Sequence, residues 1–128
     1  MKDEATEWLA YADDNLASAE VLLDHRLWNP CLQNCQQAVE KTLKAVWIER
    51  SVPFRKTHHI AELARTLAEN GTQTGLTEAD CDLLDSIYLS SKYPAAGALP
   101  DYAPDEDVCR KCLEIARRVR LTAGKQLG

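Results

Sequence analysis

Residues 29–50 read NPCLQNCQQAVEKTLKAVWIER, and this stretch decides the fold. Asn29 is a residue type that often caps a helix, and Pro30 suits the first helical turn, where its missing N–H costs nothing. No Gly or Pro follows within the stretch, so the pattern predicts a helix of about 21 residues, roughly 31 Å long. Apolar residues recur along it at spacings of three and four: Leu32, Cys35, Ala38, Val39, Leu43, Val46 and Trp47. One wide face of this helix must therefore be buried against other helices.

Helical periodicity continues on both sides of this stretch, and no segment alternates with the period of two that indicates a strand. A first helix is predicted over residues 3–24. The other expected boundaries are residues that cap or end helices: Thr57 and Asn70-Gly71 for a third helix, Thr77 with Asp80 and a stop before Pro94 for a fourth, and Asp105 or Pro104 with Gly124 for a fifth. Residues 94–104 are expected to form a loop. The sequence thus predicts an all-α, antiparallel up-and-down bundle of four to five helices, in a single domain over residues 1–128.

Length and composition fit such a domain. The 128 residues are 45% hydrophobic and 27% charged, which is ordinary for a soluble globular protein. No apolar run is long enough to cross a bilayer, and the acidic N-terminus is unlike a signal peptide. The five cysteines are an odd number, which favours reduced thiols. We therefore expect a cytoplasmic protein with no membrane partner.

The net charge of −5 argues against a general nucleic-acid binder, but the charge is unevenly spread. Residues 1–24 carry one Lys and seven acids, a net of −6. Residues 40–56 carry five Lys/Arg and two acids, a net of +3, and residues 105–128 carry six and four, a net of +2. If the two basic segments lie together in the fold, they would form a local anion site on an acidic protein.

Several motifs together resemble the HEPN domain family, the higher-eukaryote and prokaryote nucleotide-binding domain. They are Gln36-Gln37-Ala38-Val39-Glu40-Lys41, which is the most specific, Asp14-Asn15-Leu16, Thr57-His58-His59-Ile60, and Tyr88 with Lys92-Tyr93-Pro94. They follow the family's order and spacing over nearly the whole chain. The resemblance implies a bundle of four or five helices that is usually a homodimer. It also implies a role beside a minimal nucleotidyltransferase, and several members of the family act as ribonuclease toxins.

The pattern of a HEPN ribonuclease is missing from this sequence. The resemblance implies an Arg followed after four to six residues by a His, near the end of the helix before the last; the Arg would meet phosphate charge and the His would act as acid/base. The matching position here is Lys92, and residues 97–99, where the His should fall, are Gly, Ala and Leu. No other Arg precedes a His at that spacing. We therefore expect no catalytic residue and no ribonuclease activity.

Six residues are candidates for contact with a nucleotide or a partner: Lys92, Tyr93, Lys44, Lys41, Tyr88 and His58. A tyrosine next to a cation can stack on a base while the charge meets a phosphate, which makes Lys92 and Tyr93 the favoured pair. Structural roles stay open. Lys44 has a favourable helix spacing to Glu40, and His58 could serve in helix-start hydrogen bonds and packing.

Cys109 and Cys112 have the spacing of a redox motif or of half a metal site. Their position inside a helix, with no strand before it, favours buried reduced thiols. Together with Cys31 and Cys35 they would form a four-thiolate zinc site only if the two helices met in register. We expect no metal and no cofactor.

The leading interpretation is a HEPN-domain binding and regulatory protein, the partner of a minimal nucleotidyltransferase in a toxin–antitoxin-like module. Its ligand would be a nucleotide or RNA. Two alternatives are kept: an RNA-cleaving toxin with a degenerate site around Lys92 and Tyr93, and a purely structural dimerisation module. A ligand that binds the folded state stabilises it, so the structural module alone predicts no gain in stability with nucleotide.

Overall fold

The computed structural model describes residues 1–53, 56–92 and 104–127. These residues form helices and no strand: α1 Asp3–Asp24, α2 Trp28–Glu49, α3 Ile60–Glu69, α4 Glu78–Lys92 and α5 Glu106–Leu127. The predicted all-α fold class is confirmed. Three features discussed from the sequence lie outside the described part of the chain: the candidate site residue Tyr93, residues 94–103 of the expected loop, and positions 97–99, where a ribonuclease would have its His.

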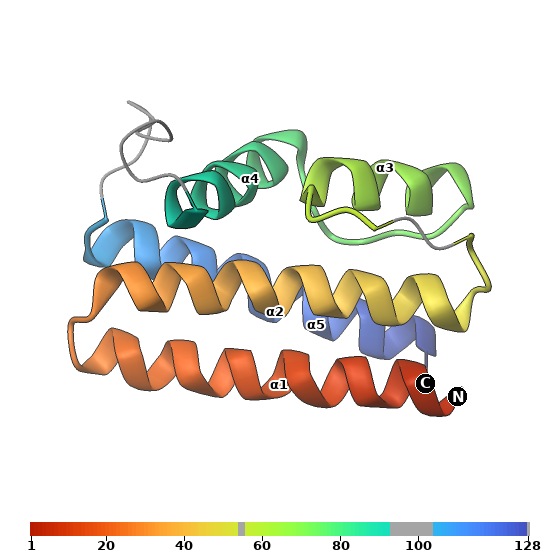
Figure 1. The fold of residues 1–128 in the computed structure, drawn as a ribbon, viewed down its shortest axis with the longest axis horizontal. Helices are drawn as coiled ribbons and strands as arrows, with labels where there is room; N and C mark the ends of the chain where they lie inside the picture. The colour runs from red at the N-terminus through yellow and green to blue at the C-terminus, as the bar shows by residue number, and fades with distance from the viewer. Residues whose placement is uncertain (54–55, 93–103, 128) are drawn as a thin grey trace.

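α2 is the centre of the bundle, because it contacts each of the other four helices. Figure 1 shows α1 alongside it, α5 behind it, and the shorter α3 and α4 lying end to end above. The apolar face predicted from the sequence is the one that is buried, with exposures of 3% or less: Leu32, Cys35, Ala38, Val39, Leu43, Val46 and Trp47. The wide apolar stripe of one long helix therefore organises the whole fold.

Two predicted helix ends are wrong. α2 begins at Trp28, one residue before the expected cap Asn29, and no side chain caps its first turn. α5 passes through Gly124 and ends at Leu127. A helical Gly is less favourable than Ala by about 1 kcal/mol. The last turn nevertheless forms, because Ala123 and Leu127 pack on the core and the Gln126 side-chain amide donates to the Gln73 carbonyl at 2.8 Å.

The cap of α3 comes from another helix, which also departs from the expectation. The carboxylate of Asp85, in α4, accepts the backbone N–H of Ile60 at 2.6 Å and that of Ala61 at 3.2 Å. Burial raises the pKa of Asp85, although these two hydrogen bonds act in the opposite direction. Thr57 instead accepts the backbone N–H of His59 within the preceding segment. Asp85 thus joins α4 to the start of α3 and fixes the segment that carries His58.

Other capping predictions are confirmed. Thr77 and Asp80 form the reciprocal capping box, with N···O distances of 3.1 and 3.0 Å. Asp105 accepts the backbone N–H of Val108 at 2.9 Å at the start of α5. Gly71 follows α3 with a φ of +79°, the left-handed conformation expected of a helix-ending Gly. Across the described ranges, no helix is both long enough and apolar enough to cross a membrane.

Candidate functional site

The candidate site is built around Glu40, a carboxylate on α2 that is only 3% exposed. Its Oε2 accepts hydrogen bonds from Nζ of Lys44 at 2.8 Å and from Nδ1 of His58 at 3.0 Å. Its Oε1 accepts the side-chain amide of Gln36 at 3.2 Å. A buried charge requires such partners, and together they hold all four side chains in place. We call these residues, Gln36, Glu40, Lys44 and His58, the Glu40 network.

The Glu40 network orients the imidazole of His58. A carboxylate accepts hydrogen bonds, so Nδ1 carries the proton of this contact and Nε2 is the ring nitrogen left for a ligand. The side chain of His58 is 49% exposed, so solutes can reach it. Its ring stacks on that of Tyr88 in α4, with centroids 5.0 Å apart and planes at 15°. Nζ of Lys92, one turn further along α4, lies 5.7 Å from the Tyr88 ring centroid.

A cavity of about 120 Å³ opens beside this row, between α2 and α4. Its lining is rich in side chains that can donate and accept hydrogen bonds: Gln33, Gln36, Gln37, Ile87, Tyr88, Ser91 and Lys92. The amide of Gln37 donates to that of Gln36 at 2.7 Å, which links the cavity wall to the Glu40 network. The cavity therefore combines an aromatic ring, a cation and several amides.

The structure brings three of the predicted site residues together: His58, Tyr88 and Lys92. Lys44 is 6% exposed and reaches this group through Glu40. Lys41 lies elsewhere: its Nζ binds Oδ1 of Asn15 in α1 at 2.8 Å and sits 5.6 Å from the Tyr11 ring centroid. Tyr93 lies outside the described residues.

Glu40, Gln36 and Gln37 were not among the predicted site residues. One signal was available in the sequence, because Gln36 and Glu40 fall between buried apolar positions of the predicted helix. Polar side chains at such positions need hydrogen-bonding partners. Which partners they find depends on α3 and α4, and no spacing within α2 reports that.

The cysteines of α2 and α5 do meet in the core. Cys31, Cys35, Cys109 and Cys112 are each 0% exposed, and all the described cysteines are unpaired thiols. A hydrogen bond with Cys35 lowers the pKa of Cys31 to about 7, although burial acts in the opposite direction. Burial raises the pKa of Cys109 and that of Cys112 to about 12 each. Within the described part of the chain, no group of three or more ligand-type side chains has an arrangement that could hold a metal ion.

Three of the four arginines of α5 are paired with carboxylates of other helices and do not add to an anion site with residues 40–56. Arg117 pairs with Glu20 at 2.9 Å, Arg120 with Asp13 at 2.7 Å, and Arg118 with Asp80 at 2.6 Å. Their charge is therefore balanced by carboxylates of α1 and α4. The uneven charge seen in the sequence serves helix packing at these positions.

These features define a small helical domain whose polar groove lies between its central helix and a shorter one. The family model of the HEPN domain matches residues 5–126, so the chain belongs to the HEPN domain family. No curated protein is similar enough to this chain to count as a match.

Two solved structures share the fold. The crystal structure of ST0689, an archaeal HEPN homologue, has a TM-score of 0.73 and 23% identity, and the match covers 100% of both chains. The crystal structure of TT1696 from Thermus thermophilus has a TM-score of 0.67 and 23% identity, with 98% of this chain and 100% of that chain covered. At this identity, the likeness establishes the common fold.

Proposed function

We propose that this HEPN domain is a binding and regulatory protein that takes a nucleotide in the cavity between α2 and α4. Its partner would be a minimal nucleotidyltransferase in a toxin–antitoxin-like module, which family membership supports. Nucleotide binding is supported mainly by the stack of His58 on Tyr88 with Lys92 beside it, at the wall of a cavity rich in glutamine amides.

The chemistry of the cavity suits the parts of a nucleotide. Aromatic rings stack on any base, and a glutamine amide can pair with a base edge because it both donates and accepts. Lys92 offers a point charge to a phosphate. A cavity of about 120 Å³ is smaller than a typical ligand pocket of roughly 300–1,000 Å³, so it holds the base only. The sugar and phosphates would then lie over Lys92 and Nε2 of His58.

We also propose that the protein is a homodimer and that it works in the cytoplasm. Homodimers are common in the family, and a dimer would supply further cover for exposed apolar side chains such as Leu27, Leu89 and Leu121. Free thiols persist in reducing compartments, which favours the cytoplasm.

Nucleotide should stabilise the wild-type protein, and Lys92→Ala should weaken that response. A ligand at about ten times its Kd adds about 1.4 kcal/mol, or a Tm rise of about 3–6 °C for a domain of this size. The measurement is thermal unfolding with and without ATP and GTP. Tyr88→Ala should reduce the response more than Lys92→Ala if the ring stacks on the base. Lys125→Ala, which removes one exposed charge from α5, is the matched control.

Co-purification tests the partner separately from the nucleotide. Wild type should co-purify with a nucleotidyltransferase from its native host. Equal shifts in Tm with nucleotide in the wild type and all three variants would contradict nucleotide binding in the cavity between α2 and α4. If no nucleotidyltransferase co-purifies, the proposed partner is wrong, regardless of the result with nucleotides.

RNA should remain intact in the presence of the purified protein. Lys92 stands where the family's ribonucleases have an Arg, and no Arg–His pair of the required spacing exists in the sequence. The assay incubates a single-stranded RNA with the protein without added metal and follows its length. Cleavage above background that Lys92→Ala or His58→Ala abolishes would show that a degenerate site is active.

A further inference from the structure

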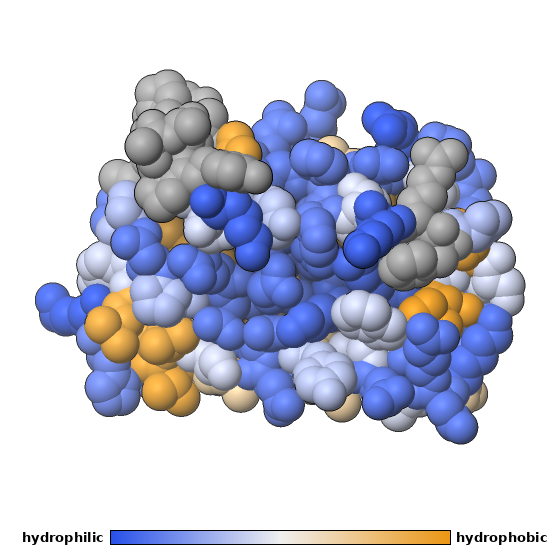
Figure 2. Space-filling model, in the orientation of Figure 1, coloured by the Kyte–Doolittle hydropathy of each residue, from blue (hydrophilic) through white to orange (hydrophobic). Residues whose placement is uncertain are grey.

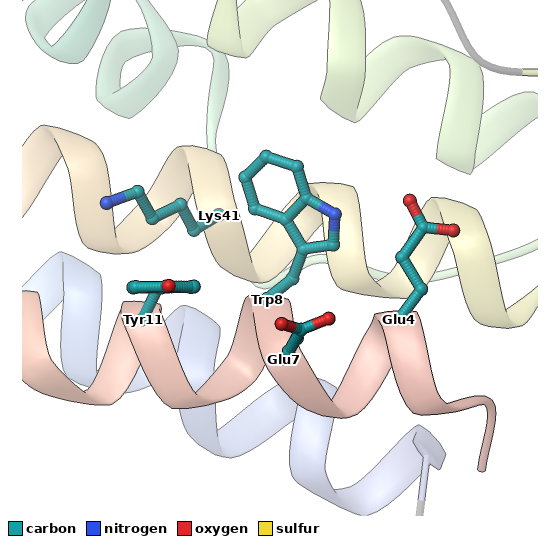
Figure 3. Close-up of a pocket in the computed structure, with 5 residues that line it drawn as sticks. All are labelled: Glu4, Glu7, Trp8, Tyr11 and Lys41. Atoms are coloured by element: carbon teal, nitrogen blue, oxygen red, sulfur yellow. The ribbon is translucent and has the colours of Figure 1, made fainter.

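A second, larger cavity lies on the other side of α2, against α1. Its volume is about 410 Å³, and it is lined by Glu4, Glu7, Trp8 and Tyr11 of α1 and by Lys41 of α2 (Figure 3). In that view the Trp8 indole extends from α1 across the front of α2, with Tyr11 on one side and the two carboxylates on the other. This volume falls within the usual range for a ligand pocket. We call it the α1 pocket.

The α1 pocket has a negative environment. Between Asp3 and Asp24, α1 contains seven acidic residues and no Lys or Arg. Two of the seven, Asp13 and Glu20, are held by arginines of α5. Glu4 and Glu7 have no ion-pair partner among the described residues, although both line the cavity. Lys41 also lines the cavity, so its charged lining residues sum to −1, which favours a cationic ligand over a phosphate-bearing one.

A lysine ammonium already lies near each of the two aromatic rings of the pocket. Nζ of Lys44 lies 5.4 Å from the Trp8 ring centroid, and Nζ of Lys41 lies 5.6 Å from that of Tyr11. Lys44 is buried and is not part of the cavity lining, whereas Lys41 lines the cavity beside Tyr11. Figure 2 shows hydrophilic residues across the middle of this side of the molecule, so the pocket is not an extended apolar patch.

We propose that the α1 pocket binds an arginine side chain from a basic segment of a partner protein. A guanidinium is planar and cationic, so it can stack on the Trp8 ring while its N–H groups pair with a carboxylate of Glu4 or Glu7, on the side of the indole away from Tyr11 and Lys41. An ammonium lacks the flat surface and the fork of donors. The inference does not depend on the nucleotide cavity, because the two cavities share no lining residue.

The test uses defined peptides and a signal from Trp8. An acetylated and amidated peptide, Ala-Ala-Arg-Ala-Ala-Arg-Ala-Ala, is titrated into the ¹⁵N-labelled protein at about 0.15 M salt, where distant charges are screened. The indole N–H signal of Trp8 is identified by its loss in Trp8→Phe. We expect it to shift saturably with the arginine peptide. Peptides with citrulline, which keeps the shape without the charge, should bind at least about tenfold more weakly, and lysine peptides at least about threefold.

Two charge-matched double variants separate the pocket from general attraction. Glu4→Gln with Glu7→Gln should raise the Kd at least about tenfold. Asp14→Asn with Asp24→Asn removes the same charge from exposed positions of the same helix outside the pocket, and should raise it less than about threefold. A Trp8 signal that does not move, equal losses in the two double variants, or equal binding of the citrulline or lysine peptide would each overturn the proposal.

Discussion

Trp47→Ala is expected to destabilise the folded protein by about 3–5 kcal/mol, the range seen when a large buried aromatic is removed. Trp47 is 0% exposed and lies in α2, and its indole N–H donates to the Leu63 carbonyl of α3 at 3.3 Å. Its loss leaves a cavity between α2 and α3 and removes a hydrogen bond that joins them. Domains of this size have a total stability of about 5–15 kcal/mol, so the variant should unfold at much lower denaturant concentration.

Two variants isolate the cause. Trp47→Phe keeps most of the volume and removes the indole N–H, so it should be milder than Trp47→Ala. Trp28→Ala removes the same side chain from a half-buried position at the start of α2, and should also be milder. The measurement is urea unfolding followed by circular dichroism. A loss below about 1 kcal/mol for Trp47→Ala would contradict the central role of this side chain.

Sequence periodicity predicted α2 and its buried face because both depend on residues that are close together in the chain. Trp47 and Leu43 recur at the helical spacing, and that spacing alone implies a common buried side. The capping box of Thr77 and Asp80 was predictable for the same reason, since its two hydrogen bonds join residues three apart. Local rules are therefore sufficient for helices and for most of their ends.

The cap of α3 shows where local rules fail. Asp85 is 25 residues from Ile60, and nothing near Ile60 indicates which carboxylate it will meet. The helix end predicted at Gly124 is wrong for a related reason: α5 continues past this Gly because its last turn packs on the core. Both errors arise because tertiary contacts outweigh local preference.

The candidate site depends on the same kind of distant contact. His58 and Tyr88 were candidates from separate motifs, but their stacking depends on how α4 lies against the segment before α3. The sequence relates Glu40 to residues of its own helix, such as Lys44 at a spacing of four. The bond of Glu40 to His58 spans 18 residues and joins two motifs that the sequence presents separately.

Glu40→Ala is expected to destabilise the protein by about 3–5 kcal/mol, because it removes one partner of a buried ion pair. The Lys44 side chain, 7% exposed, would keep its charge with no carboxylate beside it. His58 and Gln36 would also lose their acceptor. The measurement is again urea unfolding. A change below about 1 kcal/mol would mean that Lys44 finds water or another acceptor at no cost.

A double-mutant cycle distinguishes this unpaired charge from simple loss of packing. Glu40→Leu with Lys44→Met replaces both charges by apolar side chains of similar size, and such replacements of buried pairs are often neutral or stabilising. The double variant should therefore be more stable than Glu40→Leu alone, with a coupling energy of about 0.5–3 kcal/mol. If the two losses simply add, the pair is not energetically coupled. Because His58 is anchored by Glu40, the double variant should also lose much of any nucleotide response while remaining folded. Recovery of stability without recovery of nucleotide response would assign the Glu40 network to positioning His58 as well as to holding the bundle together.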